Sequence, residues 1–222
     1  AADVSTFDPE TVWTAELGAK TVMAGGRLIA NYALFYSKYD DFQARVSVGE
    51  GIDFRFPVLN AAELDIRGAE AELTWFPVDP LALFTQIGYL KSEYGAGGFF
   101  GADGIEDEPA FSPKWTARLG GTWTHELANN SQLLFTLAGN YRDAMWLSVE
   151  NKPALTEGDY WVVDAIISWV SKGGNWTVRG GVKNLTDEVY RVEGQEFSSV
   201  GGIQTAYYGN PRTYTISLDY RY

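Results

Sequence analysis

The stretch PRTYTISLDYRY, residues 211–222, decides the fold because it alternates apolar and polar side chains up to its last residue. One parity holds Tyr214, Ile216, Leu218, Tyr220 and Tyr222, and the other holds Thr213, Thr215, Ser217, Asp219 and Arg221. This alternation is the pattern of a β-strand with one apolar and one polar face. Termini of soluble domains are usually polar and frayed, so the question is what this apolar face contacts.

The composition favours strands and argues against several classes of function. Aromatic residues make up 15% of the 222 residues and Gly occurs 24 times, a mixture that suits strands and turns. There is no Cys and the one His is His125, so we expect no metal site and no cofactor. A net charge of −12 argues against a nucleic-acid partner. No set of nucleophile, base and orienting group is visible, so we expect no catalytic residues and no enzyme.

Alternating hydrophobicity predicts about nine strands in one unit, because no linker or shift of composition divides the chain. No apolar run reaches ~18 residues, so no transmembrane helix is expected. In one strand the apolar parity switches at Gly68, which predicts a β-bulge there. The predicted strands are residues 11–22, 27–40, 63–76, 81–93, 115–127, 131–143, 159–171, 175–188 and 210–222.

The connections between these strands alternate between short turns and long loops. The short ones are residues 23–26, 77–80, 127–131 and 172–174, and the long ones are residues 41–62, 94–114, 144–158 and 189–209. In an up-and-down antiparallel sheet, alternate connections lie at the same rim. Bacterial outer-membrane β-barrels have this asymmetry, with short periplasmic turns and long extracellular loops. The pattern therefore predicts an all-β, antiparallel up-and-down transmembrane β-barrel.

Aromatic and charged residues assign the two faces of the predicted barrel wall. Trp115 and Trp123, like Trp161 and Trp169, share one parity and lie eight residues apart, roughly 26 Å along a strand. That separation approximates the ~25 Å apolar band between the aromatic girdles of such barrels. Further interface aromatics are expected at Trp176, Tyr214 and Tyr220. The apolar face is thus expected to meet outer-membrane lipid, and charges on the other face require a wet lumen because burying them is unfavourable.

Five segments resemble the barrel of TonB-dependent receptors of the Gram-negative outer membrane, in the order that the family has them. They are FDPETVWTAELGAKTVMAGGRLIANYALFYSKYDDFQ (7–43), NAAELDIRGAEAELTWFPVDPLALFTQIGYLKSEY (60–94), FSPKWTARLGGTW (111–123), VKNLTDEVYRV (182–192) and NPRTYTISLDYRY (210–222). The resemblance covers nearly the whole chain. It implies an outer-membrane receptor for the energised uptake of a scarce solute such as a ferric siderophore, haem, a vitamin or an oligosaccharide.

The resemblance also implies partners and a larger protein. The family fold is a barrel of about 22 strands with a plugged lumen, so residues 1–222 are expected to be the C-terminal segment of the barrel, without the plug and the first strands. The implied partners are those missing parts, the inner-membrane TonB complex that acts through the missing N-terminus, and the barrel assembly machinery. That machinery reads a C-terminal aromatic residue, here Tyr222 in place of the usual Phe.

Candidate site residues divide into two groups. Phe99, Phe100 and Trp146 lie in predicted outer loops and are candidates for ligand contact. The acidic run Glu106–Glu108 does not have the spacing of an EF-hand and is interpreted as a solvated loop rather than a calcium site. The candidates for facing the lumen and the plug are Glu16, Lys20, Glu70, Glu72, Arg118, Arg142, Asp164, Arg179, Lys183 and Arg221.

Two other classes of protein stay open from the residues alone. A small autonomous outer-membrane barrel, acting as a pore or an adhesin, would have the same strand pattern. A soluble β-rich carbohydrate-binding module also fits period-2 alternation, although it does not explain the alternation of short turns and long loops. Native mass distinguishes the first alternative, and independence of detergent distinguishes the second.

Overall fold

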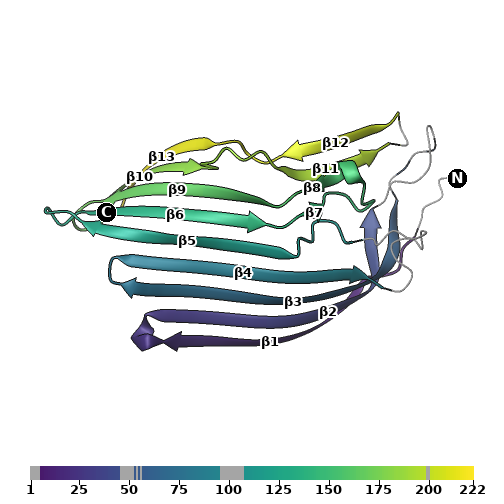
Figure 1. The fold of residues 1–222 in the computed structure, drawn as a ribbon, viewed down its shortest axis with the longest axis horizontal. Helices are drawn as coiled ribbons and strands as arrows, with labels where there is room; N and C mark the ends of the chain where they lie inside the picture. Colours follow the sequence, from purple (N-terminus) through teal and green to yellow (C-terminus); the bar gives the residue numbers. More distant parts are fainter. Residues whose placement is uncertain (1–5, 46–52, 54, 56, 96–107, 199–200) are drawn as a thin grey trace.

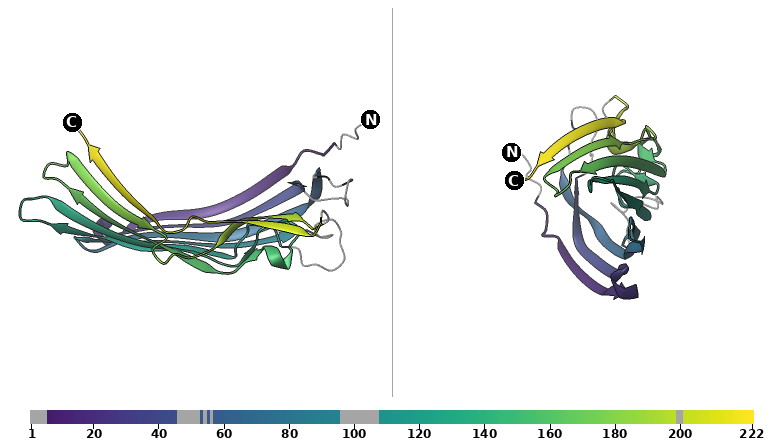
Figure 2. Two further views of the ribbon diagram at one scale, coloured as in Figure 1. Left: turned by 90° about the horizontal axis from the view of Figure 1, so that it is seen from above. Right: turned by 90° about the vertical axis from the view of Figure 1, so that its left-hand side faces the viewer.

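Nine strands form one antiparallel sheet in the computed structural model, which describes residues 6–45, 53, 55, 57–95, 108–198 and 201–222. Each strand pairs with its neighbour in the order β1-β2-β3-β4-β5-β6-β9-β10-β13. The sheet curls about its strand direction, as the end-on view in Figure 2 shows. The strands are β1 (Thr11–Met23), β2 (Leu28–Arg45), β3 (Val58–Val78), β4 (Leu81–Tyr94), β5 (Trp115–Glu126), β6 (Gln132–Arg142), β9 (Tyr160–Val170), β10 (Trp176–Lys183) and β13 (Thr213–Tyr220).

The nine strands and their up-and-down order confirm the prediction of an antiparallel meander. Short turns lie at one end of the sheet and long connections lie at the other (Figure 1). The turns close with backbone that favours Gly and Asn: Gly25 and Gly26 in the 3-10 turn η1 (Ala24–Gly26) have φ of 66° and 91°, and Asn130 has φ of 61°. Within the described residues, no helix is long and apolar enough to span a membrane.

Two small two-stranded sheets in the long connections were not predicted. One joins β7 (Met145–Trp146) to β8 (Thr156–Glu157), which follows the 3-10 turn η3 (Pro153–Leu155). The other joins β11 (Arg191–Phe197) to β12 (Ile203–Tyr208) and lies beside the first at the long-loop end (Figure 1). Leu147 and Leu155 are buried, with exposed fractions of 0% and 2%. The backbone amide of Gly194 in β11 donates a hydrogen bond to the Leu147 carbonyl. These loops therefore pack on one another around a small apolar core.

The predicted bulge at Gly68 is wrong. Gly68 pairs in unbroken register with Phe35 on β2 and with Leu90 on β4. A Cβ at this position would overlap the Phe35 ring and would lie 2.6 Å from the Tyr89 carbonyl, so glycine makes room for the ring. The register of β2 on β3 shifts nearer the loops, around Asp41, which has φ of 59°.

The parity switch in β3 has a different cause, a change of surroundings along one regular strand. On the loop side of Gly68, the outward face of β2 to β4 carries a network of exposed ion pairs. Lys38 lies 3.1 Å from Glu63, and Arg67 lies 3.1 Å from Glu93, which also pairs with Lys91. Hydrogen bonding to Lys91, together with the charge of Arg67, holds the pKa of Glu93 below its usual range. On the loop side of Gly68 the outward face is charged and suits contact with water, whereas nearer the turns it is apolar.

Candidate functional site

The concave face of the sheet is lined by rows of polar side chains that the strand register brings side by side. Register places Glu72, Gln86, Arg118 and Asn140 next to one another on β3 to β6. The Gln86 amide donates to Glu72 at 3.3 Å, and the Arg118 guanidinium donates to the Asn140 side-chain oxygen at 3.2 Å. Asn31 on β2 donates to the second Glu72 oxygen at 3.3 Å. The row is therefore a hydrogen-bonded polar strip across the wall.

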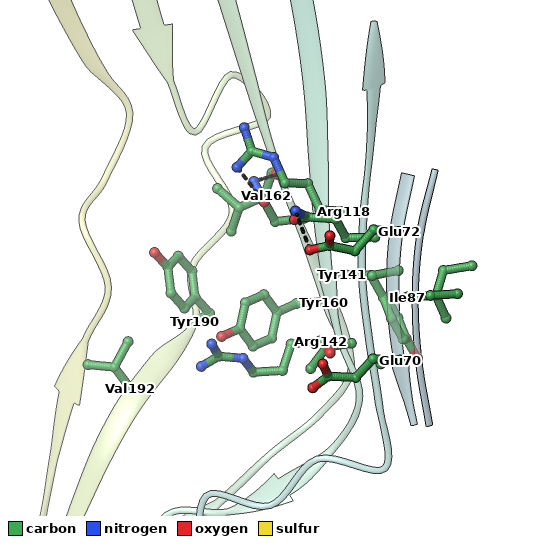
Figure 3. Close-up of a pocket in the computed structure, with 16 residues that line it drawn as sticks. Glu70, Glu72, Ile87, Arg118, Tyr141, Arg142, Tyr160, Val162, Tyr190 and Val192 are labelled. Carbon is green, nitrogen blue, oxygen red and sulfur yellow. Dashed lines mark hydrogen bonds between the residues drawn. The ribbon is translucent and has the colours of Figure 1, made fainter. Parts of the chain in front are cut away.

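A second row lies one step nearer the long loops. Register aligns Glu70, Gly88, Thr116, Arg142 and Tyr160 from β3 to β9. The two rows line a hollow of about 740 Å³, into which the side chains of Glu70, Arg142 and Tyr160 project (Figure 3). Gly88 and Thr116 lie between the charged side chains of Glu70 and Arg142, so the floor of the hollow is broad and polar.

The wall side of this hollow is completed by an aromatic pair near the loops. The ring of Tyr190, which precedes β11, stacks on the ring of Tyr160 with centroids 4.6 Å apart. The space for Tyr190 depends on Gly209, because a Cβ at that position would overlap its ring. Tyr160 itself is 8% exposed. The hollow thus combines carboxylate, guanidinium and aromatic groups from segments far apart in the sequence.

The predicted lumen residues lie on one face, but they differ in their partners. Glu16 and Lys20 on β1 line a neighbouring hollow of about 530 Å³, together with Glu70 and Glu72. Arg179 forms an ion pair with Asp219 on the adjacent strand. Asp164 accepts a hydrogen bond from the Asn184 amide at 2.9 Å. Lys183 ends β10, and Arg221 follows β13 with its amide bonded to the Asn175 carbonyl at 2.9 Å.

The predicted interface aromatics lie on the opposite, outward face. At the loop side, Trp115 packs against Tyr89 with ring centroids 4.8 Å apart, and Trp161 packs against Tyr141 at 5.2 Å. At the turn side, Trp176 packs against Tyr220 at 4.5 Å. Trp123 and Tyr214 are 45% and 73% exposed. Their contact with lipid stays a prediction.

Two further aromatic positions lie at the turn end. The Trp169 indole donates to Ser131, which is 1% exposed, at 3.1 Å. The terminal Tyr222 is fully exposed, and its ring lies 5.5 Å from that of Tyr220. Its role as an assembly signal stays a prediction.

The loop candidates for ligand contact are only partly placed. Trp146 lies in β7, where its backbone pairs with Thr156 and its carbonyl accepts the Phe111 amide at 2.9 Å. Contact of its side chain with a ligand stays a prediction. Phe99 and Phe100, like Glu106 and Asp107 of the acidic run, lie outside the described residues. Glu108 is held by Asn151, which donates to its carbonyl at 3.0 Å and accepts its amide at 2.9 Å.

The loop block is held by a few polar anchors. The Arg191 guanidinium of β11 donates to Glu157 of β8 at 2.7 Å, and both side chains are largely buried. Glu196 accepts the Ser198 amide and the Gln204 side chain. Burial alone would raise the pKa of Glu196, but these hydrogen bonds outweigh burial and hold it below the usual range. In the described part of the chain, no group of three His, Cys, Asp or Glu side chains has the geometry of a metal site.

Two of the motifs that carry the resemblance meet in one turn. Asn184, which is 2% exposed, donates to the carbonyls of Glu188 and Asn210 and accepts the Glu188 amide. Asp187 accepts the Arg212 amide at 2.9 Å and pairs with the Arg212 guanidinium. The turn ends β10 at Lys183, five residues before the predicted end. The motif residues therefore tie the last two strands of the sheet together.

Sequence reasoning missed the neutral members of the site. Asn31, Gln86, Asn140, Tyr160 and Tyr190 carry no formal charge, so a search for lumen charges passes over them. Period-2 parity could have found the first four, because Asn31, Gln86 and Asn140 share a face with Glu72 and Arg118, and Tyr160 has the parity of Asp164. Only the fold brings Tyr190 to Tyr160.

A family model described as "TonB dependent receptor-like, beta-barrel" matches residues 1–185. The chain belongs to the TonB-dependent receptor family. Members of this family are outer-membrane proteins and transporters rather than enzymes. The matched residues include eight of the nine strands of the main sheet and the whole hollow apart from Tyr190 and Val192.

Solved receptor structures have the same fold. The ferric yersiniabactin uptake receptor FyuA from Yersinia pestis matches with a TM-score of 0.77 at 21% identity, over 95% of this chain and 30% of that one. The siderophore receptor PiuA from Acinetobacter baumannii matches with 0.73 at 21% identity, over 100% and 30%. The ferric preacinetobactin receptor BauA from the same organism matches with 0.71 at 20% identity, over 94% and 29%. The chain thus spans about 30% of the length of these receptors.

Proposed function

We propose that this chain is the C-terminal part of the barrel wall of a longer TonB-dependent receptor that takes up a scarce solute. The open sheet carries the proposal: in the described residues, β1 pairs only with β2 and β13 only with β10, so two edges lack partners. A long open edge invites aggregation unless other strands cover it. Earlier strands of the same protein would pair with both edges and close the barrel.

The concave polar wall is the surface against which the N-terminal plug of such a receptor would lie. The charged residues that line it, Glu16, Lys20, Glu70, Glu72 and Arg118, are then available to the plug. Energy would come from the inner-membrane TonB complex through the N-terminal part. The barrel assembly machinery would recognise the last strand and Tyr222.

The proposed solute is a ferric siderophore. The support comes from three solved structures with the same fold: FyuA is described as a ferric yersiniabactin uptake receptor, PiuA as a siderophore receptor and BauA as a ferric preacinetobactin receptor. The paired outer loops β7–β8 and β11–β12 would form part of the entrance through which the solute arrives.

The proposal is tested on the native protein in two steps. An antibody against residues 108–198 should detect an outer-membrane protein several times larger than 24.6 kDa. A band near 24.6 kDa in the membrane would instead indicate a small autonomous barrel, and a detergent-independent protein would indicate a soluble module. Cells that express the full-length protein should then accumulate ferric siderophores, and accumulation should stop when the TonB complex is deleted. Uptake that persists without the TonB complex would contradict energised transport.

A further inference from the structure

The guanidinium group of Arg142 lies in the main hollow without a carboxylate partner. Five other arginines form ion pairs with Asp or Glu: Arg27, Arg67, Arg179, Arg191 and Arg212. Among the described residues, no Asp or Glu lies within ion-pair distance of Arg142 or of Arg118. Arg118 is held by Asn140 and lies over the Phe84 ring at 5.5 Å, whereas the neighbour of Arg142 is the Tyr160 hydroxyl.

The side chains around Arg142 leave an open cleft beside its guanidinium group. Its cross-strand neighbours are Thr116 on one side and Tyr160 on the other, and Gly88 lies beyond Thr116. These small residues leave the space above the strands open, and Tyr160 and Tyr190 border it with stacked rings. Figure 3 shows the guanidinium of Arg142 beside the Tyr160 hydroxyl, facing the hollow.

Arg142 also lies at a defined height on the wall. It is the last residue of β6, at the long-loop end of the strand. The preceding residue, Tyr141, points outward and packs on Trp161 in the loop-side row of aromatics. The Arg142 cleft therefore lies level with the outer edge of the apolar band, where a solute entering between the loops would meet the wall.

We propose that Arg142, with the stacked pair Tyr160 and Tyr190, is a binding subsite for an anionic, aromatic part of the solute. This inference rests on the proposed function. A guanidinium without a carboxylate partner attracts an anion, and its planar fork suits two oxygens of a carboxylate or a catecholate. The ring of Tyr190, which stacks on the buried Tyr160, offers an aromatic group a surface to pack on. The subsite therefore favours an anionic ferric complex of catecholate or phenolate type over a neutral hydroxamate complex.

The test is a binding measurement on the purified full-length receptor in detergent, with two probes. One is a ferric tris-catecholate, which is anionic, and the other is a ferric tris-hydroxamate of similar size, which is neutral. Arg142→Gln should raise the Kd of the anionic probe about 10- to 100-fold, the range expected for a lost charge-assisted hydrogen bond. It should change the Kd of the neutral probe less than about threefold. Arg142→Lys keeps the charge and should lose less affinity than Arg142→Gln.

The matched control is Arg27→Gln, which removes one positive charge at the turn end, where Arg27 pairs with Asp79. It should leave both Kd values unchanged. Equal weakening of both probes by Arg142→Gln, or no weakening, would overturn the subsite while the receptor function stands. If Arg142→Gln leaves the binding of both probes unchanged but lets more of a large antibiotic enter cells that express it, Arg142 contacts the plug and the subsite is overturned. If the wild-type receptor binds neither probe and takes up no ferric complex, the proposed function fails and the subsite fails with it.

Discussion

Asn184 offers the sharpest test of how the last two strands are joined. Its side chain makes three hydrogen bonds, of 2.8, 2.9 and 3.1 Å, to the backbone of Glu188 and Asn210. Each such bond contributes about 1 kcal/mol net, so Asn184→Ala should remove about 3 kcal/mol from the stability of the turn. Asn184 also has φ of 52°, and Ala in this left-handed region costs about a further 1 kcal/mol.

Asn130 provides a matched control because it has φ of 61° but is exposed. No described residue hydrogen-bonds to its side chain, so Asn130→Ala should cost only the conformational part, about 1 kcal/mol. The difference of about 3 kcal/mol corresponds to roughly 100-fold faster opening of the Asn184 turn.

The assay is amide hydrogen exchange of the full-length protein in detergent micelles. The reporters are the Asp187 amide, which donates to the Asn184 backbone carbonyl at 3.0 Å, and the Asn130 amide, which donates to the Leu127 carbonyl at 2.9 Å in its own turn. The Asp187 amide should exchange roughly 100-fold faster in Asn184→Ala than the control accounts for. An excess below about threefold would refute the reasoning that the buried Asn184 side chain holds the turn.

Three further predictions test the faces, the packing and the loop block. Ile167→Arg on the outward face should impair membrane assembly by about 2–4 kcal/mol near the midplane, while Ser168→Arg on the concave face should be milder; equal effects would reverse the face assignment. Gly68→Ala should lower the free energy of unfolding, measured by denaturant titration, by about 1–3 kcal/mol because its Cβ meets a ring and a carbonyl, and Gly180→Ala, with open space, should not. Glu196 has a lowered pKa in the folded state, so its ionised form stabilises the fold. This stabilisation should be complete above its ordinary pKa of 4.5 and should be lost as pH falls below that value. Thermal unfolding from pH 7 to 3 should therefore depend less on pH in Glu196→Gln, and an identical profile would contradict this.

The main sheet could be predicted from sequence because most of its strands meet one constant environment on each face. In β5 and β9 the apolar parity runs unbroken, so the pattern alone indicated both the strands and their faces. The same rule failed at Gly68, because β3 leaves the apolar band and its outward face becomes the water-facing side. A change of environment along a regular strand looks like a bulge when only the sequence is read.

The loop structure and half of the site could not be read from the sequence. β7 and β8 have two residues each, too few for any period to be visible. The pairing of Arg191 with Glu157 joins residues 34 positions apart, and nothing in either segment marks the other as its partner. Period-2 parity places Tyr160 on the inward face, next to the outward Trp161, but only the structure shows that Tyr160 stacks on Tyr190.

The length of β3 has a consequence for how such a receptor changes its specificity. Its 21 residues extend roughly 70 Å at ~3.4 Å per residue, whereas a membrane-spanning strand needs only about 10 residues. The loop-side parts of β2, β3 and β4 therefore form a collar of paired strands outside the lipid. Backbone hydrogen bonds hold this collar, and its exposed ion pairs contribute little individually. Loops mounted on such a collar can be lengthened, shortened or exchanged without altering any residue that touches the membrane. Such a receptor can recognise a new solute through changed outer loops while the apolar band of the sheet keeps its fit to the bilayer.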